Sequence, residues 1–242
     1  MKIITKTDIG KVRETNQDFF ATGELPGNVA WAVVCDGMGG AAGGNVASTT
    51  AVKIISEQIS AGYRASMHGQ SVYHLLTSAV NAANISIYDL SKVNPELTGM
   101  GTTVVCALII DSVAYIAHAG DSRAYLLKQG TVSQLTKDHS VVQEMVETGK
   151  ITQNEAKIHP NKNLITRALG VHSDIRVDLD EVSLDSDSVL MLCTDGLTNY
   201  VDSTELSEIS TKCSYENMAE ELVKQAMTNG GGDNVTVVTL AY

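Results

Sequence analysis

The sequence is poor in the residues that mark disulfide-rich, zinc-binding or multi-domain proteins. It has four cysteines and three prolines in 242 residues, and no two cysteines form a Cys-x-x-Cys pair. Cys35, Cys106 and Cys193 instead lie inside strand-like apolar runs, so we expect buried, reduced thiols and neither a disulfide nor a zinc site. No repeat or linker interrupts the chain. With 43% apolar residues it is predicted to form a single domain over residues 1–242.

Long apolar runs and an excess of basic residues are also missing. The longest apolar stretches, such as 104–110, are far shorter than the ~20 residues of a membrane-spanning helix. Residues 1–10 lack the apolar block of a secretion signal, so we expect a cytoplasmic protein without membrane insertion. Twenty-eight acidic residues against seventeen Lys and Arg give a formal net charge of −11, which argues against a nucleic-acid partner because a phosphate backbone needs a basic surface.

The apolar periodicity indicates an α+β fold. Helical patterns start at about residue 45 and cover 71–90, 203–211 and 215–227, whereas β-rich runs cover 2–7, 30–35, 102–110, 113–119, 124–127, 175–179, 189–192 and 235–240. The short runs between 102 and 127 predict an antiparallel meander. Helix pairs inserted between hairpins favour stacked antiparallel sheets over a parallel sheet.

Aspartates bound several of the strand-like runs. Asp36, Asp121 and Asp195 follow such runs, and Asp233 precedes the last one. Acids at the ends of strands lie at sheet edges, where nearby unpaired anions repel one another and lose solvation. A bound divalent cation relieves this cost, and oxygen ligands suit Mg²⁺ or Mn²⁺ better than zinc. The pattern therefore predicts a metal site made of carboxylates.

Two motifs have competing interpretations. Gly37-x-Gly39-x-x-Ala42 nearly fits a dinucleotide-binding fingerprint, but Asp36 would direct its charge at the pyrophosphate; a turn whose acid merely caps the helix is the simpler alternative. Asp178-x-Asp180-x-Val182 resembles the motif of phosphatases with an aspartate nucleophile. Because its acids alternate with apolar residues, we expect them on the solvent face of a half-buried strand.

A polar cluster, Arg13-Glu14-x-Asn16-Gln17-Asp18, follows the first predicted strand. Arginine can form two parallel hydrogen bonds to a phosphate and keeps its charge. Asp18 could hold metal-bound water. By itself the cluster would be an ordinary group of surface residues.

Taken together, these residues resemble the metal-dependent Ser/Thr protein phosphatases of type 2C (PPM), in their compact bacterial form. Eight short motifs match in order across nearly the whole chain: Arg13-x-x-Asn16-Gln17-Asp18, Val34-Cys35-Asp36-Gly37-Met38-Gly39-Gly40, Gly101-Thr102-Thr103, Gly120-Asp121-Ser122-Arg123, Thr136-x-Asp138-His139-Ser140, Arg167-Ala168-Leu169-Gly170, Thr194-Asp195-Gly196-Leu197 and Gly232-Asp233-Asn234-Val235-Thr236. Each motif is weak alone, and their order makes a chance match very unusual.

The resemblance implies a four-layer αββα sandwich with two central antiparallel sheets, and a mobile flap at about 138–167. It implies two core Mn²⁺ or Mg²⁺ ions bridged by Asp36, with the Gly37 carbonyl on one ion and both Asp195 and Asp233 on the other. Asp18 would grip metal-bound water, and Asp121 would hold a third, weaker ion with help from Asp195. Arg13 corresponds to the residue that binds the substrate phosphate, and Asn234 to one that orients Asp233 or a ligand water.

The implied reaction is hydrolysis of phosphoserine and phosphothreonine on proteins by direct attack of a hydroxide that bridges the two metals. Arg13 and Asp36 would be the catalytic residues, and the partners would be phosphoproteins and a bacterial Ser/Thr kinase that the enzyme opposes. We expect a monomer. One departure is Met38, which stands where many eukaryotic relatives have a histidine proposed as general acid. A regulatory module without activity, or an enzyme for small phosphoesters, are the alternatives; retention of all five acids argues against the first.

Overall fold

Two antiparallel sheets form the centre of the molecule. The computed structural model describes the backbone of all 242 residues and every side chain except that of Ala41. One sheet has the order β2 (Asp18–Leu25), β3 (Val29–Met38), β5 (Val104–Ile110), β6 (Val113–Ala119) and β9 (Asp178–Ser183), with the short β4 (Gly101–Thr102) beside β3. The other has the order β1 (Lys2–Asp8), β11 (Val235–Ala241), β10 (Ser188–Cys193), β7 (Arg123–Lys128) and β8 (Thr131–Gln134).

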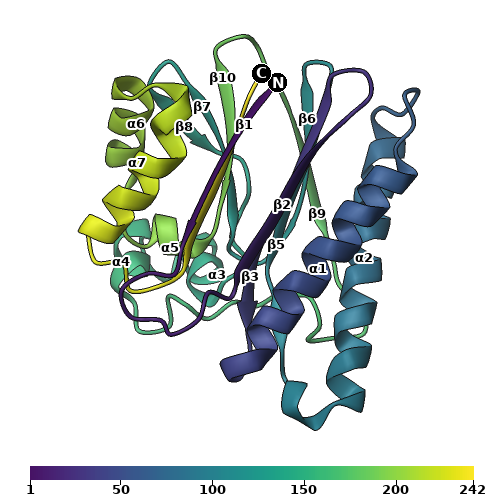
Figure 1. Cartoon of the computed structure of the whole chain (residues 1–242). Helices are drawn as coiled ribbons and strands as arrows, with labels where there is room; N and C mark the ends of the chain where they lie inside the picture. Colours follow the sequence, from purple (N-terminus) through teal and green to yellow (C-terminus); the bar gives the residue numbers. More distant parts are fainter.

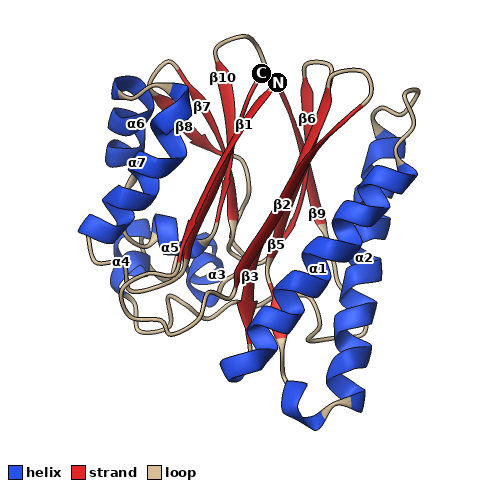
Figure 2. Ribbon diagram, in the orientation of Figure 1, coloured by secondary structure: helices blue, strands red, loops and turns tan.

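Helices cover the outer face of each sheet (Figures 1 and 2). The long α1 (Gly40–Gly62) and α2 (Gln70–Val93) pack on the six-stranded sheet, and the 3₁₀ turn η1 (Pro95–Leu97) follows them. The five-stranded sheet is covered by α5 (Asp195–Thr198), α6 (Ser203–Lys212) and α7 (Tyr215–Thr228). Apolar side chains from both sheets fill the space between them. The predicted four-layer αββα sandwich is confirmed.

The sequence of β3 explains how one strand serves two layers. Ala30, Ala32 and Val34 face the other sheet, whereas Trp31 and Val33 face α1 and α2. Successive side chains of a strand point to opposite faces, so a strand buried on both sides needs an uninterrupted apolar run. Strands β1 and β11 pair from Lys2 opposite Ala241 to Asp8 opposite Val235, which places the two chain ends side by side (Figure 1).

Four sequence-based expectations on the fold were wrong. The run 102–127 is not one meander, because β5 and β6 pair in one sheet while β7 lies in the other; the chain crosses between sheets at Gly120 and Asp121. Strand β2 was not predicted. Helix α1 begins at Gly40 instead of about residue 45, because contacts of its glycines with neighbouring backbone outweigh their low helix propensity. Strand β9 begins at Asp178 and not at 175.

Asp178 also differs from its predicted position on the solvent face. It is half-buried, and its carboxylate accepts hydrogen bonds from Arg167 and His139. Asp180 is exposed, as expected. Alternation along the strand could not reveal that another segment covers its first residue.

The polar segment 138–167 forms two short helices beside one end of the sheets (Figure 1). Helix α3 (Val141–Glu147) is capped by Ser140, and α4 (Gln153–Ile158) by Thr152 in a capping box. A β-bridge between Ser140 and Ile165 closes the base of the segment. Among the residues described, no helix is long and apolar enough to cross a membrane.

Candidate metal centre

The predicted acids gather at one end of the two sheets, although they are far apart in sequence. Asp36 lies near the end of β3, Asp195 begins α5 directly after β10, and Asp233 precedes β11. Asp121 lies in the crossing from β6 to β7. All four line one cavity of about 770 Å³. The cluster forms because the two sheets bring residues from separate parts of the chain to the same end of the molecule.

Glycine follows two of these acids for a steric reason. A Cβ on Gly37 would lie 2.0 Å from the carbonyl oxygen of Gly44 in α1, and a Cβ on Gly196 would lie 1.8 Å from that of Asn234. Both distances are far below van der Waals contact. The Asp-Gly pairs therefore allow neighbouring backbone to approach directly behind the acids, which brings the strands together at this end.

The motif Gly101-Thr102-Thr103 holds Asp36. The hydroxyl of Thr102 donates to the backbone carbonyl of Asp36 at 2.8 Å, and the Asp36 N–H donates to the Thr103 hydroxyl at 3.0 Å. The Thr103 N–H also donates to the Asp36 carbonyl at 2.9 Å. The sequence alone gives these threonines no role, because their contact with Asp36 spans about 66 residues.

Asp18 lies beneath the cavity, directly opposite Asp36 in the pairing of β2 with β3. The hydroxyls of Thr194 and Thr236 donate to its Oδ2 at 2.8 and 2.7 Å. Its Oδ1 is buried and has no hydrogen-bond partner among the residues described. Burial raises the pKa of Asp18 to about 7, against the two threonine hydrogen bonds that lower it.

The cluster is electrostatically unfavourable in the protein alone. Burial, followed by repulsion from the neighbouring acids, raises the pKa of Asp36 well above its usual range. Burial and the charge of Asp233 raise the pKa of Asp195, and burial and Asp195 raise that of Asp121 to about 8. Asp195 Oδ1 is buried without a partner among the described residues. Unpaired carboxylate oxygens around one cavity fit hard divalent cations.

Arg13 and Asn234 lie at the same cavity. The Arg13 guanidinium donates to both oxygens of Asp233, from Nε to Oδ1 at 2.8 Å and from Nη2 to Oδ2 at 2.9 Å. The Asn234 backbone N–H donates to Asp233 Oδ1 at 2.8 Å. Its side-chain amide donates to the carbonyls of Ile9 and Thr15 at 2.8 and 3.0 Å, while its Oδ1 accepts from the Gln17 N–H at 2.8 Å. Asn234 thus fastens the loop that carries Arg13.

The structure brings all the predicted site residues together. Arg13, Asp36, Gly37, Asp121, Asp195, Asp233 and Asn234 line the cavity, Asp18 lies below it, and Met38 lies at its wall. The predicted free thiols are also confirmed: Cys35, Cys106 and Cys193 are buried and unpaired.

A four-layer sandwich with clustered carboxylates at one end is typical of a metal-dependent hydrolase. The pattern of the family described as "Protein phosphatase 2C" matches residues 11–235. The serine/threonine phosphatase Stp of Listeria welshimeri is 38% identical over 234 residues, which cover 96% of this chain and 92% of that protein.

Two solved structures are similar along the whole chain. The serine/threonine phosphatase Stp1 of Staphylococcus aureus superposes with a TM-score of 0.94 at 34% identity, covering 100% of this chain and 94% of Stp1. The catalytic domain of the phosphatase PstP, solved with two manganese ions, gives a TM-score of 0.86 at 33% identity, covering 98% of this chain and 96% of that one. The chain belongs to the protein phosphatase 2C family, whose members are metal-dependent serine/threonine protein phosphatases.

Proposed function

We propose that the chain hydrolyses phosphoserine and phosphothreonine on proteins with two Mn²⁺ or Mg²⁺ ions held in the acidic cavity. Asp36 and the Gly37 carbonyl would hold one ion, Asp36, Asp195 and Asp233 the other, and Asp121 with Asp195 a third, weaker one. Asp18 would bind the water around the ions. The observation that carries the proposal is the convergence of Asp36, Asp195 and Asp233 on one cavity beside Arg13.

In this proposal some residues of the chain would hold the cations, and Arg13 would bind the substrate phosphate and offset its charge. When bound, the cations supply Lewis acidity, which ionises water near neutral pH and withdraws charge from the phosphoryl oxygens. Arg13 would bind two phosphoryl oxygens with its planar fork and offset their growing charge. Its present partner Asp233 would then be neutralised by cations instead of by Arg13. Met38 cannot donate a proton, so the leaving serine or threonine oxygen would take its proton from solvent.

We propose that residues 1–242 form one catalytic domain, and that segment 138–167 is a flap, because its residues Asn163 and Ile165 line the same cavity as Arg13. Substrate proteins would contact this segment, and a Ser/Thr kinase of the same cell would phosphorylate them. We propose a monomer in the cytoplasm, where the free thiols stay reduced.

Phosphate release measured with and without Mn²⁺ tests the proposal. The substrates are a phosphothreonine peptide and p-nitrophenyl phosphate. We expect the peptide to be hydrolysed only with Mn²⁺ or Mg²⁺. We expect the aryl phosphate to be hydrolysed more slowly than the peptide. Activity on the peptide in excess chelator would refute the metal assignment, and activity on the aryl phosphate alone would refute the protein substrate. Anomalous scattering from Mn²⁺ in crystals then locates each ion.

A further inference from the structure

His139 lies at the base of segment 138–167. Its backbone N–H donates to the carbonyl of Gly120 at 2.9 Å, and its own carbonyl accepts from the Thr166 N–H at 2.8 Å. The bridge between Ser140 and Ile165 lies next to these bonds. His139 therefore joins both arms of the segment to the crossing between the two sheets.

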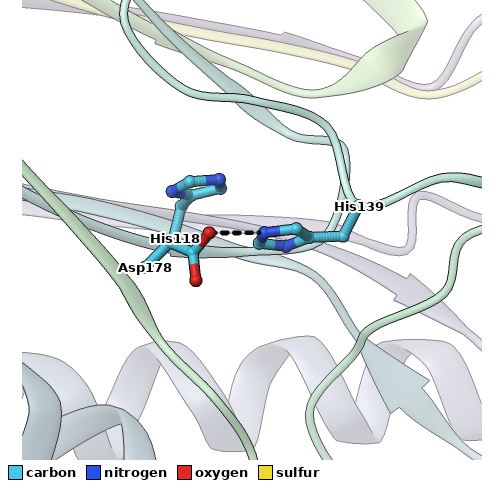
Figure 3. A group of neighbouring side chains, drawn as sticks. All are labelled: His118, His139 and Asp178. Carbon is cyan, nitrogen blue, oxygen red and sulfur yellow. Dashed lines mark hydrogen bonds and ion pairs between the residues drawn. The ribbon is translucent and has the colours of Figure 1, made fainter. Parts of the chain in front are cut away.

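The imidazole of His139 has a fixed tautomer. The Gly120 N–H donates to its Nδ1 at 3.0 Å, so Nδ1 carries no hydrogen. The hydrogen of a neutral ring then lies on Nε2, which is 3.1 Å from its acceptor Asp178 Oδ2 (Figure 3) and also lies 2.9 Å from Arg167 Nη1. Burial lowers the pKa of His139, which favours the neutral ring.

Asp178 anchors the far side of the ring. Arg167 donates to Asp178 Oδ1 at 2.8 Å. Burial alone would raise the pKa of Asp178, but the hydrogen bonds from His139 and Arg167 outweigh it and lower the pKa to about 2. The ring of His118 stacks on His139 with centroids 4.7 Å apart (Figure 3). The imidazole is thus held at both nitrogens and on one face.

His118, His139 and Asp178 could in principle hold a metal ion, since their ligand atoms lie within 4.8 Å of one another. A metal ion at this group is disfavoured, because the positively charged Arg167 guanidinium lies 2.9 Å from His139 Nε2 and already pairs with Asp178. The Gly120 N–H occupies the lone pair of Nδ1. The ligand atoms of His139 and Asp178 are therefore already engaged, and we assign this pair another role.

That role concerns Asp121, which follows Gly120 directly. Gly120 has a φ of +120°, and a Cβ there would lie 2.7 Å from the Thr103 side chain, so the bend has little freedom. The Gly120 N–H belongs to the peptide before the residue and its carbonyl to the peptide that leads into Asp121. His139 binds both groups, so it orients two consecutive peptides that set the position of the Asp121 carboxylate.

We propose that His139 is a positioning residue for Asp121 and couples segment 138–167 to the divalent cation that Asp121 holds. The inference rests on the proposed role of Asp121 as a ligand. The bond that matters is the one from the Gly120 N–H to Nδ1. The link from Nε2 through Asp178 to Arg167 holds the ring in place against the segment.

Two substitutions at His139 separate these links. In His139→Asn the amide oxygen reaches the place of Nδ1 and can accept from Gly120, but the link to Asp178 is lost. In His139→Gln the amide reaches the place of Nε2 and can donate to Asp178, but Gly120 loses its acceptor. A purely structural role would make the two variants equally defective.

Calorimetric titration with Mn²⁺ measures the weakest binding step in the wild type, Asp121→Asn, His139→Asn and His139→Gln. We expect Asp121→Asn to abolish that step, His139→Gln to weaken it by about tenfold, as for other residues that orient metal ligands, and His139→Asn to stay within about twofold of wild type. Equal affinities for the two His139 variants would overturn the proposal. If Asp121→Asn leaves every step unchanged, the ligand assignment fails and the inference with it, whereas loss in Asp121→Asn without loss in His139→Gln refutes the positioning role alone.

A spectroscopic measurement of the His139 tautomer uses the wild-type protein, so it does not require any variant to fold. Long-range ¹H–¹⁵N correlation distinguishes the imidazole nitrogens, and we expect His139 to be neutral with its hydrogen on Nε2 at pH 7. A hydrogen on Nδ1 would contradict the bond from Gly120 and overturn the proposal.

Discussion

The guanidinium of Arg13 faces the carboxylate of Asp233 and donates one hydrogen bond to each of its oxygens, at 2.8 and 2.9 Å. This pair joins the residue proposed to bind phosphate to a residue proposed to bind metal. Asp233 also raises the pKa of Arg13, by hydrogen bonding and by its charge. The same two nitrogens can turn to a phosphoryl group when cations neutralise the acid, so binding of metal and of substrate are expected to favour each other.

Replacing Arg13 tests this relationship. Arg13→Ala removes both hydrogen bonds to a phosphoryl group, and we expect KM for a phosphothreonine peptide to rise about tenfold or more, since ~1.4 kcal/mol corresponds to a factor of ten. Arg13→Lys keeps the charge but cannot form two parallel hydrogen bonds, so its KM should lie between those of the wild type and Arg13→Ala. Exposed Lys53 on α1 offers the control Lys53→Ala, which should behave as wild type. An unchanged KM in Arg13→Ala would remove Arg13 from the phosphate site.

Replacing an acid of the cluster should separate stability from activity. Asp36→Asn and Asp233→Asn each remove a ligand, so we expect turnover to be lost. In the presence of chelator, Asp36→Asn should unfold at a temperature equal to or above that of wild type, because one source of repulsion is gone. The exposed Asp89 gives the control Asp89→Asn. Near wild-type turnover in either cluster variant would contradict the ligand assignment.

The metal-free protein should lose stability as pH rises. Asp18 and Asp121 have pKa values raised to about 7 and about 8, above the ~3.9 of an unfolded aspartate. Between these values the folded state binds more protons than the unfolded state, so unfolding becomes easier from about pH 4 to pH 8. Mn²⁺ binds the deprotonated acids and should reverse the loss, by ~2.7 kcal/mol at 100 times its Kd. Thermal unfolding at four pH values, with Mn²⁺ or with chelator, measures both effects. A metal-free stability that rises with pH would contradict these raised pKa values.

Asn234 should be required for the loop that carries Arg13. Asn234→Ala leaves the partly buried carbonyls of Ile9 and Thr15 and the Gln17 N–H without protein partners. We expect a loss of about 1–2 kcal/mol in the free energy of unfolding, because water can replace some of these bonds and each intramolecular hydrogen bond contributes ~0.5–1.5 kcal/mol. Hydrogen exchange over residues 9–17 should become faster. Exposed Asn217 serves as control in Asn217→Ala, and equal exchange in both variants would refute the role.

Much of the site could be predicted because its residues bound regular elements. Asp36, Asp195 and Asp233 each stand at the end of an apolar run, and hydrophobic periodicity is the strongest local pattern in a sequence. Helices α6 and α7 were predicted within one residue of their bounds for the same reason. Helix α1 was placed too late, because its first turns depend on contacts with β3 and Met100.

The threonine hydroxyls that hold Asp18, and the contacts of the His139 ring with Gly120 and Asp178, could not be predicted from the sequence. Thr194 and Thr236 meet Asp18 from another sheet, and His139 meets Gly120 and Asp178 from three separate segments. Such contacts leave no periodic pattern. The resemblance to a family pointed to the motifs without explaining them.

The sequence by itself determined the α+β class, the buried thiols and the aspartates that bound strands, because composition and periodicity are local properties of the chain. The resemblance of its motifs to a family then added Arg13 and Asp18 to that set. Only the tertiary structure decided that the chain changes sheets at Gly120, that Arg13 pairs with Asp233, and that Asp178 is held by His139 and Arg167. These features depend on which distant segments share the low-dielectric space at the end of two sheets, where each buried charge must find a partner.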